Sequence, residues 1–137
     1  MNNVKILIDS SGSMGEIGVS SVVKYVINIL SNNLLNNRIE YQLLSINNEV
    51  REYKKIEFNG KLDGNVLKNY LNKNKNETII FLSDGDFYIK EIDEILENPN
   101  LYCIRISESV KVDLEKLTTR DKIFHSSQVS SLLKEII

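Results

Sequence analysis

Short, continuously apolar segments alternate along the chain with longer stretches of helical periodicity. The first segment, residues 4–8, is rich in β-branched residues and stops at Asp9 and a cluster of Ser and Gly. This pattern is typical of a buried strand followed by a loop. Similar apolar segments predict further strands at residues 39–46, 78–82, 101–106 and 123–124.

Apolar residues three or four positions apart predict helices between the strands, because this spacing places them on one helical face. The longest stripe begins at Val19 and ends at Leu34. The last helix is expected to be capped by Ser126 or Ser127. The shorter stripes predict helices at residues 66–71, 89–96, 114–117 and 129–137.

One pair of strands breaks this alternation. Asn47-Asn48 can adopt the left-handed conformations of a tight turn, so residues 50–56 are expected to return antiparallel to the strand at 39–46. Charged residues along the returning strand suit an exposed sheet edge. The sequence therefore predicts a single domain over residues 1–137. We expect an α/β three-layer sandwich with a doubly wound, mostly parallel, Rossmann-like six-stranded sheet and one antiparallel edge strand.

The composition narrows the class of protein. Apolar residues make up 42% and charged residues 26%, the balance of a soluble globular protein. The net charge of −2 gives no general attraction to nucleic acid. No apolar run approaches the roughly 20 residues that cross a bilayer, and no secretory signal is visible. The single Cys103 suits a reducing compartment, so we expect a cytoplasmic protein without nucleic-acid or membrane partners. The chain has no Ala, which is typical of an AT-rich genome such as that of a low-GC bacterium or its phage.

Two of the predicted buried strands end in loops rich in oxygen-bearing side chains. Residues 9–13 are Asp-Ser-Ser-Gly-Ser, and residues 83–86 are Ser-Asp-Gly-Asp. In sheets of this kind ligands bind at the carboxyl ends of the strands, where Asp9 and Asp84 would converge. A carboxylate and two hydroxyls suit a hard cation such as Mg²⁺ or Mn²⁺. Because hydroxyls are neutral, such an ion keeps positive charge and can accept a carboxylate from another molecule.

The same residues carry a family resemblance. Residues 9–14, Asp-Ser-Ser-Gly-Ser-Met, resemble the Asp-x-Ser-x-Ser motif of von Willebrand factor A (vWA) domains, and residues 81–85 resemble the family's later strand ending in Ser-Asp-Gly. The order of elements also fits, so the resemblance spans essentially the whole chain. It implies a metal-ion-dependent adhesion site (MIDAS), and the residues that it assigns to the ion are Asp9, Ser11, Ser13 and Asp84.

One loop departs from the family pattern. The family usually supplies a Thr from a glycine-containing loop before the middle helix, but the counterpart here, residues 59–65, contains neither Thr nor Ser. Lys61 stands nearest to the Thr position, and Asp63 could approach the ion directly or through a water. A Lys there would repel the ion. Alternatively, its ammonium could pair with Asp9 or Asp84 and replace part of the metal's charge.

The leading hypothesis is a non-enzymatic adaptor that captures an Asp or Glu of a cytoplasmic protein partner through Mg²⁺ or Mn²⁺. The chain is similar to small free-standing bacterial vWA domains, which implies a place beside AAA+ ATPases of the MoxR type or in a multi-component stress or conflict system. A plainer interpretation makes Asp9 or a neighbouring Ser the cap of the next helix.

Two enzyme classes compete with this hypothesis. A metal-dependent ribonuclease of the PIN type would use Asp9, Glu40, Asp84 and Asp86 as ligands, although the hydroxyl-rich loop has no role in it and no basic cluster is present to hold phosphate. A phosphatase of the haloacid type would need a second Asp where Ser11 stands. His125 is the only His, so a structural role suits it better than catalysis.

Overall fold

The sheet has six strands in the order β3-β2-β1-β4-β5-β6. The computed structural model describes residues 3–53, 57–85, 98–106, 114–115 and 117–137. All neighbouring strands pair in parallel except β2 and β3, which are antiparallel. The strands are β1 (Asn3–Asp9), β2 (Glu40–Ile46), β3 (Val50–Glu52), β4 (Thr78–Ser83), β5 (Leu101–Arg105) and β6 (Ile123–His125).

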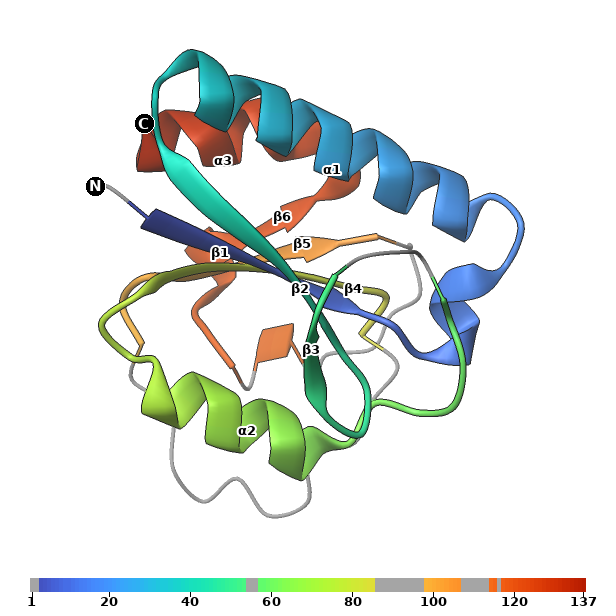
Figure 1. Ribbon diagram of the computed structural model, residues 1–137. Coiled ribbons are helices and arrows are strands. Elements are labelled where there is room, and N and C mark those ends of the chain that lie inside the picture. The colour runs from blue at the N-terminus through green and yellow to red at the C-terminus, as the bar shows by residue number, and fades with distance from the viewer. Residues whose placement is uncertain (1–2, 54–56, 86–97, 107–113, 116) are drawn as a thin grey trace.

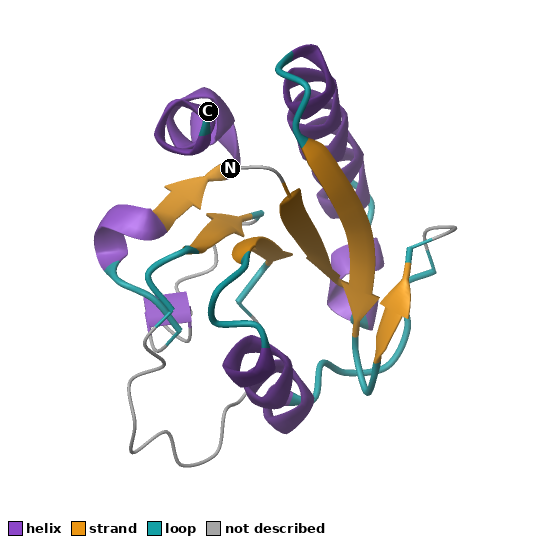
Figure 2. Cartoon of the chain, turned by 60° about the vertical axis from the view of Figure 1, so that its left-hand side comes forward, coloured by secondary structure: helices purple, strands orange, loops and turns teal. Residues whose placement is uncertain are grey.

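Helices cover both faces of this sheet (Figures 1 and 2). One face packs against α1 and α3 through alternate strand residues such as Ile6 and Ile8. The other face packs against α2, and Leu7 points to that side. The predicted α/β class with one antiparallel edge strand is therefore confirmed. The helices are α1 (Val19–Asn36), α2 (Gly64–Lys73) and α3 (Val129–Ile136), with short 3₁₀ helices η1 (Gly12–Gly15), η3 (Arg120–Lys122) and η4 (Ser126–Gln128).

The topology places a ligand site between β1 and β4. From β1 the chain continues through α1 to β2, which lies on one side of β1 in the sheet. It later continues through α2 to β4, which lies on the other side of β1. The order of strands thus reverses between β1 and β4, the place where open α/β sheets bind ligands. Because the two strands are parallel, Asp9 and Ser83 end at the same edge of the sheet.

One local detail differs from the expectations. The last helix, α3, has Gln128 at its N-cap position without a side-chain cap, so neither Ser126 nor Ser127 caps it. A cap is found instead at η4, where the His125 side chain accepts a hydrogen bond from the Ser127 amide and the Gln128 side chain accepts one from the His125 amide. This arrangement gives His125 a structural role at the start of η4. The predicted helix at 89–96 and the carboxylate of Asp86 lie outside the described residues. Among the residues that are described, no helix is long and apolar enough to span a membrane.

Candidate metal site

Asp9 is the centre of a hydrogen-bonded cluster at the carboxyl edge of the sheet. Its side chain is fully buried. The Ser83 hydroxyl donates to Asp9 Oδ2 at 2.7 Å, and the Ser11 backbone amide donates to Asp9 Oδ1 at 2.9 Å. Both carboxyl oxygens are therefore held in place by neighbours from β4 and from the loop after β1.

Burial changes the acidity of this group. Desolvation raises the pKa of Asp9 from 3.8 to about 6, against hydrogen bonds from Ser83 and Ser11 that lower it. The negative charge of Asp84 adds to the increase in the pKa. A nearby cation stabilises the ionised form of such a buried carboxylate, because the opposite charge offsets the cost of desolvation.

The two serines of the motif place their hydroxyls together. Ser11 Oγ and Ser13 Oγ are 3.3 Å apart. Ser11 is 3% exposed and Ser13 is half-buried, at the start of η1. In an octahedral site with oxygen ligands at about 2.1 Å, adjacent ligands are about 3 Å apart. The separation of the two hydroxyls thus fits neighbouring positions around one Mg²⁺-sized ion.

Asp84 approaches the cluster from β4. It follows Ser83 directly and is 6% exposed. The Gly85 amide donates to Ser83 Oγ at 3.0 Å, and Gly85 adopts a φ of 78°, which favours glycine. This tight turn brings Asp84 near enough to Asp9 for their charges to interact. Across the described part of the chain, no three His, Cys, Asp or Glu residues gather where they could hold a metal, so hydroxyls would have to complete a set of ligands.

A second loop is bound to the motif through its backbone. The Gly12 amide donates to the Gly60 carbonyl at 2.9 Å, and the Asn59 amide donates to the Ser10 carbonyl at 3.0 Å. Gly60 has a φ of 65°, so the turn that offers this carbonyl suits glycine. The loop before α2 therefore lies beside the motif, where the family resemblance placed the missing Thr.

The two candidate residues of that loop, Lys61 and Asp63, differ in the contacts that they make. Lys61 is exposed and takes part in neither of the ion pairs found within the described ranges, Arg51–Glu49 and Arg120–Glu115. Asp63 Oδ1 accepts the amides of Asn65 and Val66, at 2.9 and 3.4 Å. It is thus the N-cap of α2, which already uses one of its two carboxyl oxygens.

The structure does not bring together the ligand set of a PIN-type nuclease. Glu40 pairs with Asn3 at the start of β1, whereas Asp9 pairs with Ile46. Six residues of strand separate the two positions, about 20 Å at 3.3 Å per residue. Asp86, the fourth member of that set, lies outside the described residues.

Ser83 and Gly60 are parts of the site that sequence reasoning did not single out. A small polar residue in the last position of a buried strand, next to an Asp-Gly turn, is the signal that could have identified Ser83. No comparable signal in the sequence identifies the carbonyl of Gly60, because every residue has a backbone carbonyl and a backbone contact between distant loops does not require a particular residue type.

Comparisons with known proteins support the fold. No family model matches the chain, and no curated protein matches it by sequence. Among solved structures the chain is similar to proximal thread matrix protein 1 (PTMP1) from the mussel byssus, with a TM-score of 0.70, 14% identity and coverage of 98% of this chain and 46% of that one. Crystal form 2 of PTMP1 matches with a TM-score of 0.67 and 14% identity over 100% of this chain and 47% of that one. A third PTMP1 structure, which has a zinc-occupied MIDAS motif, matches with the same values.

These likenesses show a vWA-like fold. The chain spans about half the length of the PTMP1 structures that it matches.

Proposed function

We propose that this protein binds a divalent cation, Mg²⁺ or Mn²⁺, through Asp9, Ser11, Ser13 and Asp84 and uses it to capture a protein partner. The observation that carries the proposal is the pair of serine hydroxyls 3.3 Å apart beside a buried carboxylate. A PTMP1 structure with a zinc-occupied MIDAS motif has the same fold, which adds support.

The donor set favours binding over catalysis. A bound ion would offer a Lewis-acidic site to an Asp or Glu of the partner. The chain's own contribution is to fix the carboxyl of Asp9 through Ser83 and to hold the loop of Ser11 through Gly60. The only His of the sequence, His125, is engaged in capping η4, and the carboxyl groups of Asp9 and Asp84 are the ones that we assign to the metal ion. We therefore propose a non-enzymatic adaptor.

We further propose where this adaptor acts, in which cellular compartment and in which kind of system. The thiol of Cys103 is fully buried, and burial raises its pKa far above the usual range. An inert, reduced thiol fits a cytoplasmic protein. We propose that the chain acts in a bacterial multi-component system, of the AAA+ ATPase type or of the stress and conflict type, where a subunit with an exposed Asp or Glu would be the partner.

The test is capture of partners from a lysate of the native host, with Ser11→Ala beside wild type and the exposed Ser130→Ala as matched control. Cross-linking with mass spectrometry then identifies the partner residue that contacts the site. We expect an Asp or Glu of one protein, captured with Mg²⁺ by wild type and Ser130→Ala, and lost with EDTA or with Ser11→Ala. Capture that survives both EDTA and Ser11→Ala would contradict the proposal, as would Mn²⁺-dependent cleavage of single-stranded RNA that Asp84→Asn abolishes.

A further inference from the structure

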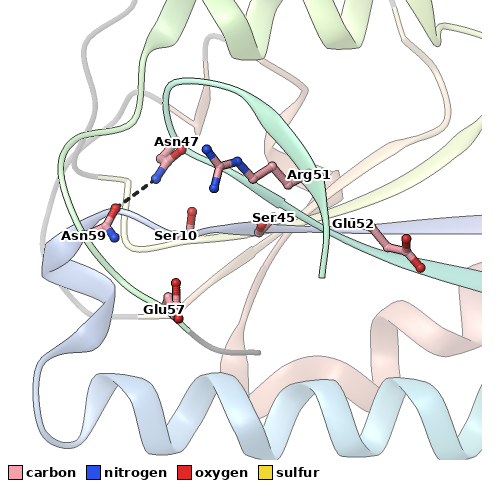
Figure 3. A pocket seen from close by; sticks show the side chains of 7 residues that line it. All are labelled: Ser10, Ser45, Asn47, Arg51, Glu52, Glu57 and Asn59. Carbon is pink, nitrogen blue, oxygen red and sulfur yellow. Dashed lines mark hydrogen bonds between the residues drawn. The ribbon is translucent and has the colours of Figure 1, made fainter. Parts of the chain in front are cut away.

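A polar hollow of about 290 Å³ lies beside the candidate metal site, between the β2–β3 hairpin and the segment 57–59 (Figure 3). Ser10 and Ser45 line its floor, and Glu57 and Asn59 approach it from the segment opposite the hairpin. Nothing in the metal-binding proposal uses this space.

The hollow and the metal site share one piece of backbone. Ser10 lies between Asp9 and Ser11, and its hydroxyl donates to the Ile46 carbonyl at 3.1 Å. The Ser10 carbonyl accepts the amide of Asn59. Asn47 then donates to the Asn59 side chain at 3.2 Å, which links the hairpin to the opposite segment. These bonds fix the walls of the hollow directly beside the motif.

The charges around the hollow favour a cation. Arg51 lines it, but its guanidinium is bound to the carboxylate of Glu49. Glu52 and Glu57 line it as well, and neither forms an ion pair with another residue in the described ranges. Among the residues that the structure describes, these two carboxylates therefore have no ion-pair partner, and the hydroxyls of Ser10 and Ser45 can accept further hydrogen bonds.

From this geometry we infer that the hollow receives a Lys or Arg side chain of the partner whose Asp or Glu binds the metal ion. This inference rests on the proposed function and specifies its partner. Because Ser10 is one residue from each of two proposed ligands, the two recognised side chains would lie within roughly 10 Å, about three residues of extended chain. The protein would then recognise an acidic and a basic residue close together in one segment.

The first experiment tests the hollow without any metal. N-acetyl-arginine-N-methylamide is titrated into ¹⁵N-labelled protein in EDTA, and the matched neutral probe is the citrulline analogue. We expect the arginine probe to shift the amide resonances of Ser45, Asn47 and Asn59 at millimolar concentration. The citrulline probe should bind at least about threefold more weakly, because it lacks the charge that pairs with the two carboxylates.

Variants locate this binding. The double variant Glu52→Gln/Glu57→Gln should weaken the arginine probe at least about threefold, because it removes the uncompensated charge. The control Glu40→Gln/Glu135→Gln removes the same two charges, at the far end of β2 and on α3, and should leave binding unchanged. Equal binding of the two probes, or no effect of the double variant, would overturn the inference.

A second experiment separates failure of the hollow from failure of the metal site. Three hexapeptides are compared in Mg²⁺: one with Asp and Arg two glycines apart, one with Arg replaced by citrulline, and one with Asp replaced by Asn. We expect the first peptide to bind tightest. The loss of affinity on replacing Arg by citrulline (the Arg effect) should disappear in Glu52→Gln/Glu57→Gln. The loss of affinity on replacing Asp by Asn (the Asp effect) should disappear in Ser11→Ala. An Asp effect without an Arg effect overturns the inference and leaves the proposed function standing. An Arg effect without an Asp effect overturns the proposed function, and the absence of both effects overturns the two together.

Discussion

The hydroxyl of Ser83 donates a 2.7 Å hydrogen bond to Oδ2 of Asp9 from 74 positions away in the chain. The bond joins the last residues of β1 and β4, the strands on either side of the point where the strand order reverses. With the Ser11 amide on Oδ1, it orients the carboxyl group through residues of two separate segments. Pre-orientation of this kind lowers the cost of binding a ligand.

Removing this hydrogen bond should destabilise the fold. Ser83→Ala leaves Asp9 Oδ2 buried without its side-chain donor, so the free energy of unfolding at pH 7 should fall by about 1–3 kcal/mol. Urea denaturation in EDTA measures the change. Ser130→Ala, an exposed serine on α3, should stay within about 0.5 kcal/mol of wild type. If Ser83→Ala were no more destabilising than Ser130→Ala, the bond would have no energetic role.

The raised pKa of Asp9 predicts a pH dependence of stability. The folded protein holds the proton up to about pH 6, whereas the unfolded chain releases it near 3.8. Between these values the folded state binds more protons, so the contribution of Asp9 to the free energy of unfolding falls as pH rises. Relative to wild type, Asp9→Asn should therefore gain stability from pH 4 to pH 6, by up to about 3 kcal/mol.

Denaturation of wild type and Asp9→Asn in EDTA at several pH values measures this difference. Comparing the two proteins removes the titration of other carboxyl groups, which they share. A difference that stays flat from pH 4 to pH 7 would contradict a raised pKa at Asp9.

Packing between the motif loop and the segment before α2 can be tested at two glycines. A Cβ added to Gly15 would lie 2.8 Å from Phe58 Cβ, whereas one added to Gly12 would lie 3.6 Å from the Gly60 carbonyl oxygen. Gly15→Ala should therefore lower the midpoint of thermal unfolding, by an amount equivalent to about 1–3 kcal/mol, because overpacking forces a shift. Gly12→Ala should have a smaller effect. The reverse order would show that Phe58 does not pack against η1 as described.

Lys61 is the residue whose replacement should strengthen metal binding. Lys61 follows Gly60, whose carbonyl is bound to the Gly12 amide, so we expect its positive charge to oppose a cation bound at the motif. Lys61→Thr and Lys61→Gln should both increase the affinity for Mn²⁺ by about threefold to tenfold, as measured by calorimetry. The increase should be larger for Lys61→Thr, because the Thr hydroxyl can act as a ligand. Lys68→Gln on α2 is the matched control for loss of one charge. Equal affinities in all four proteins would mean that the Lys61 ammonium does not face the ion.

Much of this architecture follows from local pattern. The strands β1 and β4 end close to where their apolar segments end, at Asp9 and at Ser83, directly before Asp84. The change from apolar to polar residues at these positions therefore predicted the carboxyl edge of the sheet. The contact of Gly12 with Gly60 could not be predicted, since it joins two backbones whose side chains give no signal. The cap at His125 was missed for a different reason. Ser is the usual capping residue, but here an imidazole nitrogen accepts the amide of Ser127 instead.

Above all, we propose that Ser11 and Ser13 hold a divalent cation beside Asp9. The most direct test is titration of Mn²⁺ into the purified protein at pH 7.5, followed by calorimetry or by the electron paramagnetic resonance signal of free Mn²⁺. We predict that wild type and Ser130→Ala bind a single ion with equal affinity, and that Ser11→Ala and Ser13→Ala each bind it about tenfold more weakly or worse. Equal Mn²⁺ affinity in all four proteins, or no binding by wild type at millimolar Mn²⁺, would contradict the claim.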